Sequence, residues 1–201
     1  MRIYYDYENT FFDENNRSLG NCITISENNK KYYYEFCINM NEALVKCNDN
    51  SYINEAIEYY RKYNKYINIF YNEERSFYKQ YDSIFSFKLP IKVIQPSKFF
   101  LNESKLDYFD NNLDFDNIYL PVAIINDEYV LLDGHHRLAC LNQNFYKMVN
   151  VYVDNYEYHI NDFVYIAKEN NIFNIKNLKV LPDLDYKREW EGFYNQYFEY
   201  N

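Results

Sequence analysis

One stretch of the chain decides the fold, and it reads Tyr129-Val130-Leu131-Leu132-Asp133-Gly134-His135-His136-Arg137-Leu138-Ala139-Cys140-Leu141. The apolar residues at its start predict a buried strand, the Asp-Gly pair predicts a tight turn, and the residues that follow predict a helix. Only three glycines occur in 201 residues. A glycine between a strand and a helix therefore indicates a backbone that needs a positive φ or room for a close approach.

The loop between this strand and this helix carries groups suited to phosphate. The unpaired N–H groups and the positive end of the helix dipole bind anions at a helix N-terminus. Arg137 adds a planar fork of donors that fits phosphate oxygens. His135 and His136 can supply two further donors, or one donor and one general base. We expect Asp133 to cap the helix, to hold a histidine tautomer or to bind a metal ion that accompanies the phosphates.

An ordinary solvated turn is the alternative interpretation of the same loop. Asp-Gly is a common turn signal, and adjacent histidines also occur in solvated loops. Residues 133–137 by themselves leave the two interpretations evenly balanced. The loop matches neither a P-loop nor a Rossmann fingerprint.

Strands and helices alternate on both sides of the loop. Strands are expected at 91–94, 120–125, 129–132 and 149–153, and helices at 103–109, 137–142, 160–170 and 187–198. Cys140 lies inside the second of these helices, where a buried thiol is the simpler expectation than a nucleophile. The pattern predicts an α+β fold with a small mixed β-sheet and helices.

The residues before Pro90 do not show this alternation of strands and helices. Residues 21–26 and 31–38 read as two strands of a hairpin, and a helix that Ser51 can cap follows them. Residues 66–71 are either a strand or the tail of that helix. We therefore divide the chain into an N-terminal hairpin-plus-helix extension (1–85), a central domain (86–160) and a C-terminal helical segment packed on it (161–201).

Composition and charge limit the kinds of binding partner and the cellular location that we expect for this protein. The net charge is −9, and no basic stripe stands apart from the acidic residues, which disfavours DNA as a partner. The 26 tyrosines accompany many Asn, Ile and Lys residues, which is typical of an AT-rich genome and does not require a base-stacking surface. The four cysteines lack C-x-x-C spacing, and no apolar stretch is as long as a membrane span. We expect a cytoplasmic protein with reduced thiols.

Residues 129–139 resemble the ParB/sulfiredoxin superfamily, whose members carry a strand, a D-G-x-x-R loop and a helix. Residues 91–96 resemble the first strand of that family and its proline, and residues 149–153 resemble the strand after the helix. The resemblance covers roughly a third of the chain. It implies a nucleotide-binding domain with N-terminal and C-terminal extensions. In such a domain Gly134, His135, His136 and Arg137 bind the phosphates of ATP or CTP, and Asp133 lies near a Mg²⁺ ion.

The chain departs from each branch of that family. Sulfiredoxins need a cysteine where this chain has His135, so repair of sulfinic acid is not expected. Partition proteins continue into a basic helix-turn-helix region, whereas the residues after Val153 are not basic. The kinases that phosphorylate free serine resemble this chain most in their loop, but they have an acidic residue after the proline of the first strand, where this chain has Ser97. Glu103 or Asp107 could supply the base instead.

Three functions follow from these observations. The first is a Mg²⁺-dependent phosphotransferase or nucleotide hydrolase that acts on a small hydroxyl acceptor or on water, with His135, His136 and Asp133 as catalytic residues. Lys98 is a further candidate for phosphate binding, although a surface lysine is the simpler expectation. The second is a nucleotide-gated binding module, or a partition- or nuclease-type protein that acts through DNA or a protein partner. The third is an interaction protein whose loop is vestigial.

Overall fold

The computed structural model describes residues 1–6, 9–14, 16 and 20–200, and the chain divides into two compact units, Met1–Ile84 and Phe85–Asn201. None of the helices in these described residues has the length and apolarity needed to cross a membrane.

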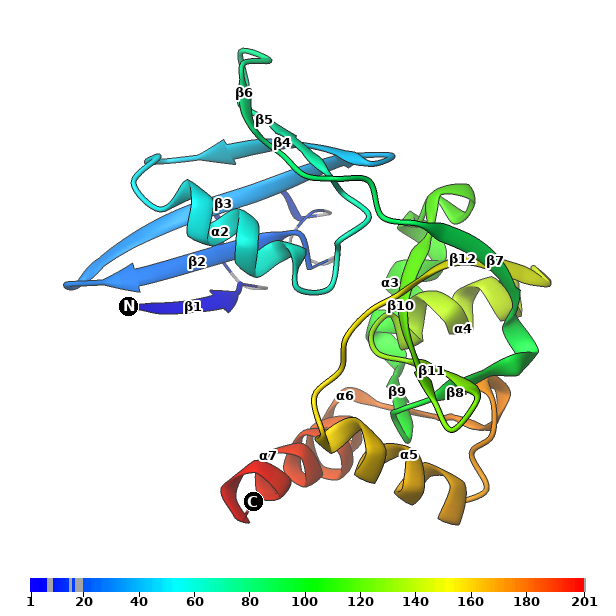
Figure 1. Cartoon of the computed structure of the whole chain (residues 1–201). Helices are drawn as coiled ribbons and strands as arrows, with labels where there is room; N and C mark the ends of the chain where they lie inside the picture. Colours follow the sequence, from blue (N-terminus) through cyan, green and yellow to red (C-terminus); the bar gives the residue numbers. More distant parts are fainter. Residues whose placement is uncertain (7–8, 15, 17–19, 201) are drawn as a thin grey trace. The chain divides into compact units, whose positions relative to one another are not determined.

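The first unit contains a six-stranded sheet with one helix, α2, on a face of it (Figure 1). The strands, in their order across the sheet, are β1 (Arg2–Tyr5), β2 (Cys22–Glu27), β3 (Lys30–Asn39), β4 (Glu42–Cys47), β5 (Ile69–Tyr71) and β6 (Phe77–Gln80). Helix α2 (Ile53–Arg61) connects β4 to β5, which run parallel. The rings of Phe36 and Tyr60 stack with centroids 4.0 Å apart and join the helix to the sheet.

The predicted hairpin is confirmed as β2 and β3, but the prediction of a hairpin plus a helix was incomplete. Four further strands complete the sheet, and three of them have at most four residues, too few for a period-2 pattern to stand out. The stretch 66–71 contains a strand rather than the tail of a helix. Ser51 does not cap α2, because the N-cap is Tyr52 and the Ser51 amide binds Asp49 instead.

The second unit is built on a five-stranded mixed sheet, which confirms the predicted α+β class. Its strands, in their order across the sheet, are β7 (Ser86–Pro90), β12 (Met148–Val153), β10 (Tyr119–Ile125), β11 (Glu128–Leu131) and β8 (Ile94–Pro96). The β12–β10 and β11–β8 pairs are parallel, and the β7–β12 and β10–β11 pairs are antiparallel. Helices α3 (Glu103–Asn112) and α4 (His135–Gln143) form the crossovers.

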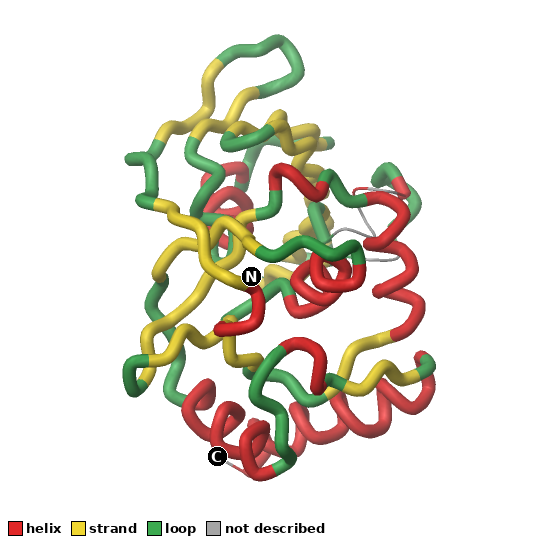
Figure 2. Tube along the Cα trace, turned by 90° about the vertical axis from the view of Figure 1, so that its right-hand side faces the viewer, coloured by secondary structure: helices red, strands yellow, loops and turns green. Residues whose placement is uncertain are grey.

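The C-terminal residues share the core of this second unit. Helix α5 (His159–Glu169) lies beside α7 (Gly192–Tyr200), as Figure 1 shows, and Phe163 packs against Trp190 with ring centroids 5.9 Å apart. Figure 2 shows helices around the C-terminal end of the chain. Strand β13 (Lys179–Leu181) pairs in parallel with β9 (Phe100–Asn102). The prediction of a C-terminal helical segment did not include this strand, because three residues leave little periodicity and the partner strand is about 80 residues away.

The expected strand at 91–94 was misplaced. Ile91–Val93 forms a single 3₁₀ turn, and the strand β8 begins at Ile94 and includes Pro96. A proline fits there because β8 lies at the edge of the sheet, where one side of the strand needs no N–H donor.

Candidate functional site

The predicted loop connects the end of strand β11 to the start of helix α4. Gly134 is the N-cap of α4 with φ +84°, and the amide of Leu138 makes the first helical hydrogen bond to its carbonyl at 2.9 Å. A Cβ atom on Gly134 would lie 2.5 Å from Leu120 Cδ2 and 3.0 Å from Arg137 Nε. The positive φ, one of the two predicted reasons for a glycine here, is therefore confirmed, and Leu120 and Arg137 fill the space that a side chain would need.

The two histidines of the loop are buried, with 3% and 7% of their surfaces exposed, and each accepts a backbone hydrogen bond. The N–H of Ser97 donates to His135 Nε2 at 3.1 Å, and the N–H of Asn102 donates to His136 Nε2 at 2.9 Å. An imidazole that accepts through Nε2 is neutral and carries its proton on Nδ1. Both histidines thus fasten the segment 97–102 to the start of α4.

Burial also opposes protonation of these imidazoles. It lowers the pKa of His136 to about 2, with the nearby charges of Lys98 and Lys105 acting in the same direction. Burial, followed by the charges of Lys98 and Arg137, lowers the pKa of His135 well below its ordinary value. A role as general base would require Nε2 to give up its backbone donor. The predicted contact of His135 and His136 with phosphate would have to use the Nδ1–H group of each ring as the donor.

Arg137 and Asp133 form an ion pair across the first turn of α4. Arg137 Nη2 donates to Asp133 Oδ2 at 3.0 Å, and their side chains are 17% and 47% exposed. The expectation that Asp133 caps the helix is wrong, because Gly134 is the N-cap and no side chain caps α4. Asp133 does not hold a histidine tautomer either, since backbone amides do so. Its role as a metal ligand stays a prediction.

Lys98 lies beside the loop and is half-buried, so the simpler expectation of a surface lysine is wrong. Its Nζ donates to Tyr186 Oη at 3.2 Å and lies 5.1 Å from the ring centroid of Trp190. Burial lowers the pKa of Lys98, and the carboxylates of Asp133 and Glu191 oppose that shift. The structure thus brings Lys98 to the loop, where phosphate binding was expected.

Sequence reasoning missed Lys105 as a member of this site. Asn102 caps α3, and its side chain accepts from the Lys105 amide at 2.8 Å. The pKa of Lys105 is lowered by desolvation of its ammonium group and by the positive charge of Lys98. An asparagine three residues before a lysine at a predicted helix start could have placed Lys105 in the first turn of α3. Nothing local could have placed it near Lys98.

Lys98, Lys105 and Arg137 form what we call the cation cluster, at the N-terminal end of α4. The first-turn amides of α4 add partial positive charge there and have no intrahelical acceptor. The chain as a whole is acidic. A local concentration of positive charge in an acidic protein can bind an anion without attracting a nucleic acid over the whole surface.

A metal ion at this site would need oxygen ligands from a bound phosphate compound as well as from the protein. The described residues hold no group of three or more His, Cys, Asp or Glu side chains placed for a metal ion. Mg²⁺ is commonly held by one or two carboxylates together with substrate phosphates. Asp133 fits that pattern as a single carboxylate beside the cation cluster.

Cys140, one turn after Arg137, is fully buried, and burial raises its pKa to about 12, as expected for a structural thiol.

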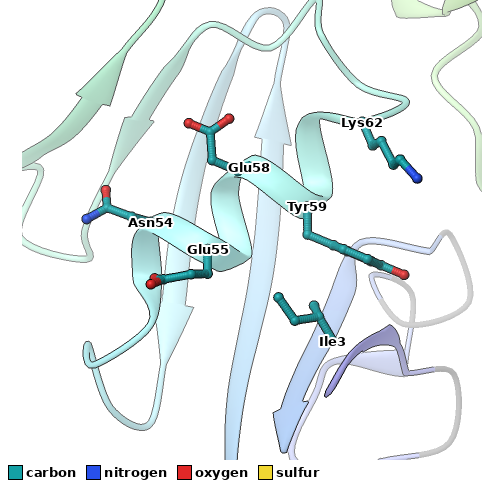
Figure 3. A pocket seen from close by; sticks show the side chains of 6 residues that line it. All are labelled: Ile3, Asn54, Glu55, Glu58, Tyr59 and Lys62. Carbon is teal, nitrogen blue, oxygen red and sulfur yellow. The ribbon is translucent and has the colours of Figure 1, made fainter. Parts of the chain in front are cut away.

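A separate depression lies on the first unit and contains none of these residues. Figure 3 shows its lining side chains, which are Ile3, Asn54, Glu55, Glu58, Tyr59 and Lys62. It is shallow and open to solvent. Glu58 is already bound to Lys79 Nζ at 2.6 Å and to Tyr81 Oη at 2.8 Å. These contacts engage the carboxylate of Glu58 with two side chains that do not line the depression.

Comparison with known proteins yields matches to solved structures. No protein-family model matches the chain, and no curated protein matches it. The protein Atu1540 from Agrobacterium tumefaciens matches with a TM-score of 0.35 and 16% identity over 47% of this chain and 61% of that chain. The C-terminally truncated chromosome-partitioning protein ParB from Caulobacter crescentus, complexed with CTP-gamma-S, matches with a TM-score of 0.31 and 18% identity over 44% of this chain and 53% of that chain. The aligned region thus spans less than two thirds of either neighbour, and TM-scores this low establish no ligand for the present chain.

Proposed function

We propose that the N-terminal end of α4 binds the phosphate groups of a nucleoside triphosphate, ATP or CTP, together with Mg²⁺. The observation that carries the proposal is the convergence of the cation cluster on an uncapped helix N-terminus. The absence of a side chain at Gly134 lets the Arg137 guanidinium pack close to the backbone at the start of α4. The two histidines position the segment that carries Lys98 and the cap of α3.

Transfer or hydrolysis of a phosphoryl group is the activity that we propose for this site. Such reactions depend mainly on positioning and on neutralising charge, which a cation cluster with a Mg²⁺ ion provides. Asp133 would hold the ion beside the phosphates, and the acceptor would be a small hydroxyl compound or water. A nucleotide-gated binding module, which binds without turnover, is the second candidate. Release of ADP in the presence of an acceptor separates the two.

We expect Arg137→Ala to weaken nucleotide binding by more than tenfold. The substitution removes a charged hydrogen-bond donor worth about 1.5–3 kcal/mol. Arg188→Ala is the matched control, because the side chain of Arg188 is 70% exposed and pairs with Asp185 and Glu189. The measurement is isothermal titration with ATP and CTP, with and without Mg²⁺. Unchanged affinity in a folded Arg137→Ala protein would refute the proposed phosphate site.

A thermal-shift screen with ATP, CTP, GTP and ADP identifies the nucleotide, since a ligand that binds only the folded state raises the apparent stability. A shift with ATP that requires Mg²⁺ favours the phosphotransferase. A shift with CTP favours the gated module. No shift with any nucleotide, in wild type and Arg188→Ala alike, contradicts the proposal.

A further inference from the structure

The ammonium group of Lys98 is held by two aromatic residues from the C-terminal part of the second unit. Lys98 Nζ donates to Tyr186 Oη at 3.2 Å, and it lies 5.9 Å from the ring centroid of Tyr186 and 5.1 Å from that of Trp190. Among the described residues, no carboxylate forms an ion pair with Lys98. A half-buried ammonium group with these neutral contacts keeps its charge and its other N–H donors available to an anion.

Tyr186 is fixed against the start of α4 by two connections. Its buried ring contacts the ring of His136, with centroids 6.2 Å apart. The second connection runs through Asn102, whose amide donates to His136 and whose side chain donates to Asp183 Oδ1 at 2.8 Å. Asp183 is the first residue of helix α6 (Asp183–Tyr186), which ends at Tyr186. The tyrosine hydroxyl is therefore held in place relative to the loop that precedes α4.

Trp190 is anchored in the core of the same unit. Its buried ring lies 5.3 Å from the ring of Phe99, centroid to centroid, and Phe99 is the residue after Lys98. Tyr186 and Trp190 are four residues apart in consecutive helical turns, a spacing that places two side chains on one face. The segment that carries the ammonium group thus packs on the helical turns that hold it.

We propose that Tyr186 is a positioning residue for Lys98, supported by Trp190, so that residues 183–190 complete the phosphate site; this inference rests on the proposed nucleotide binding. A lysine that is free before binding loses rotamer freedom when it contacts a phosphate, which weakens affinity by about three- to tenfold. The Tyr186 hydroxyl holds the ammonium group before the nucleotide arrives and removes most of this loss. Tyr186 acts through Lys98 and does not contact the phosphates.

Tyr186→Phe in the full chain tests this inference, because it removes the hydroxyl and keeps the buried ring. Isothermal titration with Mg²⁺–ATP and Mg²⁺–CTP measures the affinity. We expect Tyr186→Phe to weaken binding about three- to tenfold, since Lys98 must then be ordered on binding. Lys98→Met, which removes the charge and keeps an unbranched side chain, should weaken binding more than about tenfold.

A double-mutant cycle separates positioning from support of the fold. In the Lys98→Met background, Tyr186→Phe should have no further effect on affinity, because the group that it positions is gone. Damage to the fold would instead lower the affinity in both backgrounds. Tyr194→Phe is the matched control, since Tyr194 also contacts Trp190, with ring centroids 6.2 Å apart, but is not among the described contacts of Lys98. It should bind nucleotide as the wild type does.

Three results would overturn the inference and leave the proposed function standing on Arg137. They are wild-type affinity in Tyr186→Phe, wild-type affinity in Lys98→Met, and an equal loss from Tyr186→Phe with and without Lys98. A loss in Tyr194→Phe as large as that in Tyr186→Phe would also contradict it. Wild-type protein that binds neither ATP nor CTP would overturn the proposed function and this inference together.

Discussion

Replacing Gly134 with alanine is expected to lower the free energy of unfolding by about 2–5 kcal/mol. A residue with a side chain at φ +84° is strained by about 1–2 kcal/mol. The added Cβ would also lie 2.5 Å from Leu120 Cδ2, and Leu120 is fully buried, so the core must shift at a cost of about 1–3 kcal/mol. Arg137 must move as well, because its guanidinium nitrogens lie 3.0 and 3.1 Å from the same point.

Urea unfolding of the wild-type and variant proteins measures this loss. Gly192→Ala is the matched control. Gly192 has helical dihedral angles, φ −60° and ψ −48°, and the nearest atom to a Cβ there is 3.9 Å away. Alanine at that position should stabilise the helix by up to about 1 kcal/mol. Equal effects of the two substitutions would show that the Gly134 backbone relaxes without strain.

The strand, the loop and the helix around Gly134 could be predicted because their signals are local. Residues 129–141 contain the apolar strand, the Asp-Gly pair and the helical spacing in one continuous stretch. The α+β class followed from the alternation of similar stretches. The first unit was predicted less completely, since strands as short as Ile69–Tyr71 carry too few residues to show a period.

The partners of the site residues could not be predicted, because they come from distant segments. His135 and Ser97 are 38 residues apart, and Lys98 and Tyr186 are 88 residues apart. The sequence shows two histidines in a loop that resembles a phosphate-binding loop. Histidine at such a position suggests hydrogen-bond donors to phosphate or a general base. Only the fold reveals that their Nε2 atoms accept hydrogen bonds from the backbone, which makes them positioning residues for the segment that carries Lys98.

Stability should depend on pH because of the same two histidines. In the folded state they stay neutral, with the pKa of His136 lowered to about 2 and that of His135 lowered well below its ordinary value. In the unfolded state each has a pKa of about 6.5 and binds a proton at lower pH. The unfolded state then binds more protons, so stability rises with pH. Their contribution is complete above about pH 6.5 and is lost as pH falls from there toward the folded-state pKa values.

Between pH 7 and pH 5 this linkage amounts to about 2 kcal/mol for His136, and His135 contributes in the same direction. Urea unfolding at several pH values, in buffer without divalent cations, measures it. The variants His135→Gln and His136→Gln keep an acceptor oxygen for the backbone N–H but do not titrate, so each should make the free energy of unfolding less dependent on pH. His159→Gln should retain the contribution of the pair, since His159 lies on α5 and makes neither of these backbone contacts. If both loop variants kept the full wild-type pH dependence, the histidines would not be neutral acceptors, and the segment that carries Lys98 would have to be held to α4 by other contacts.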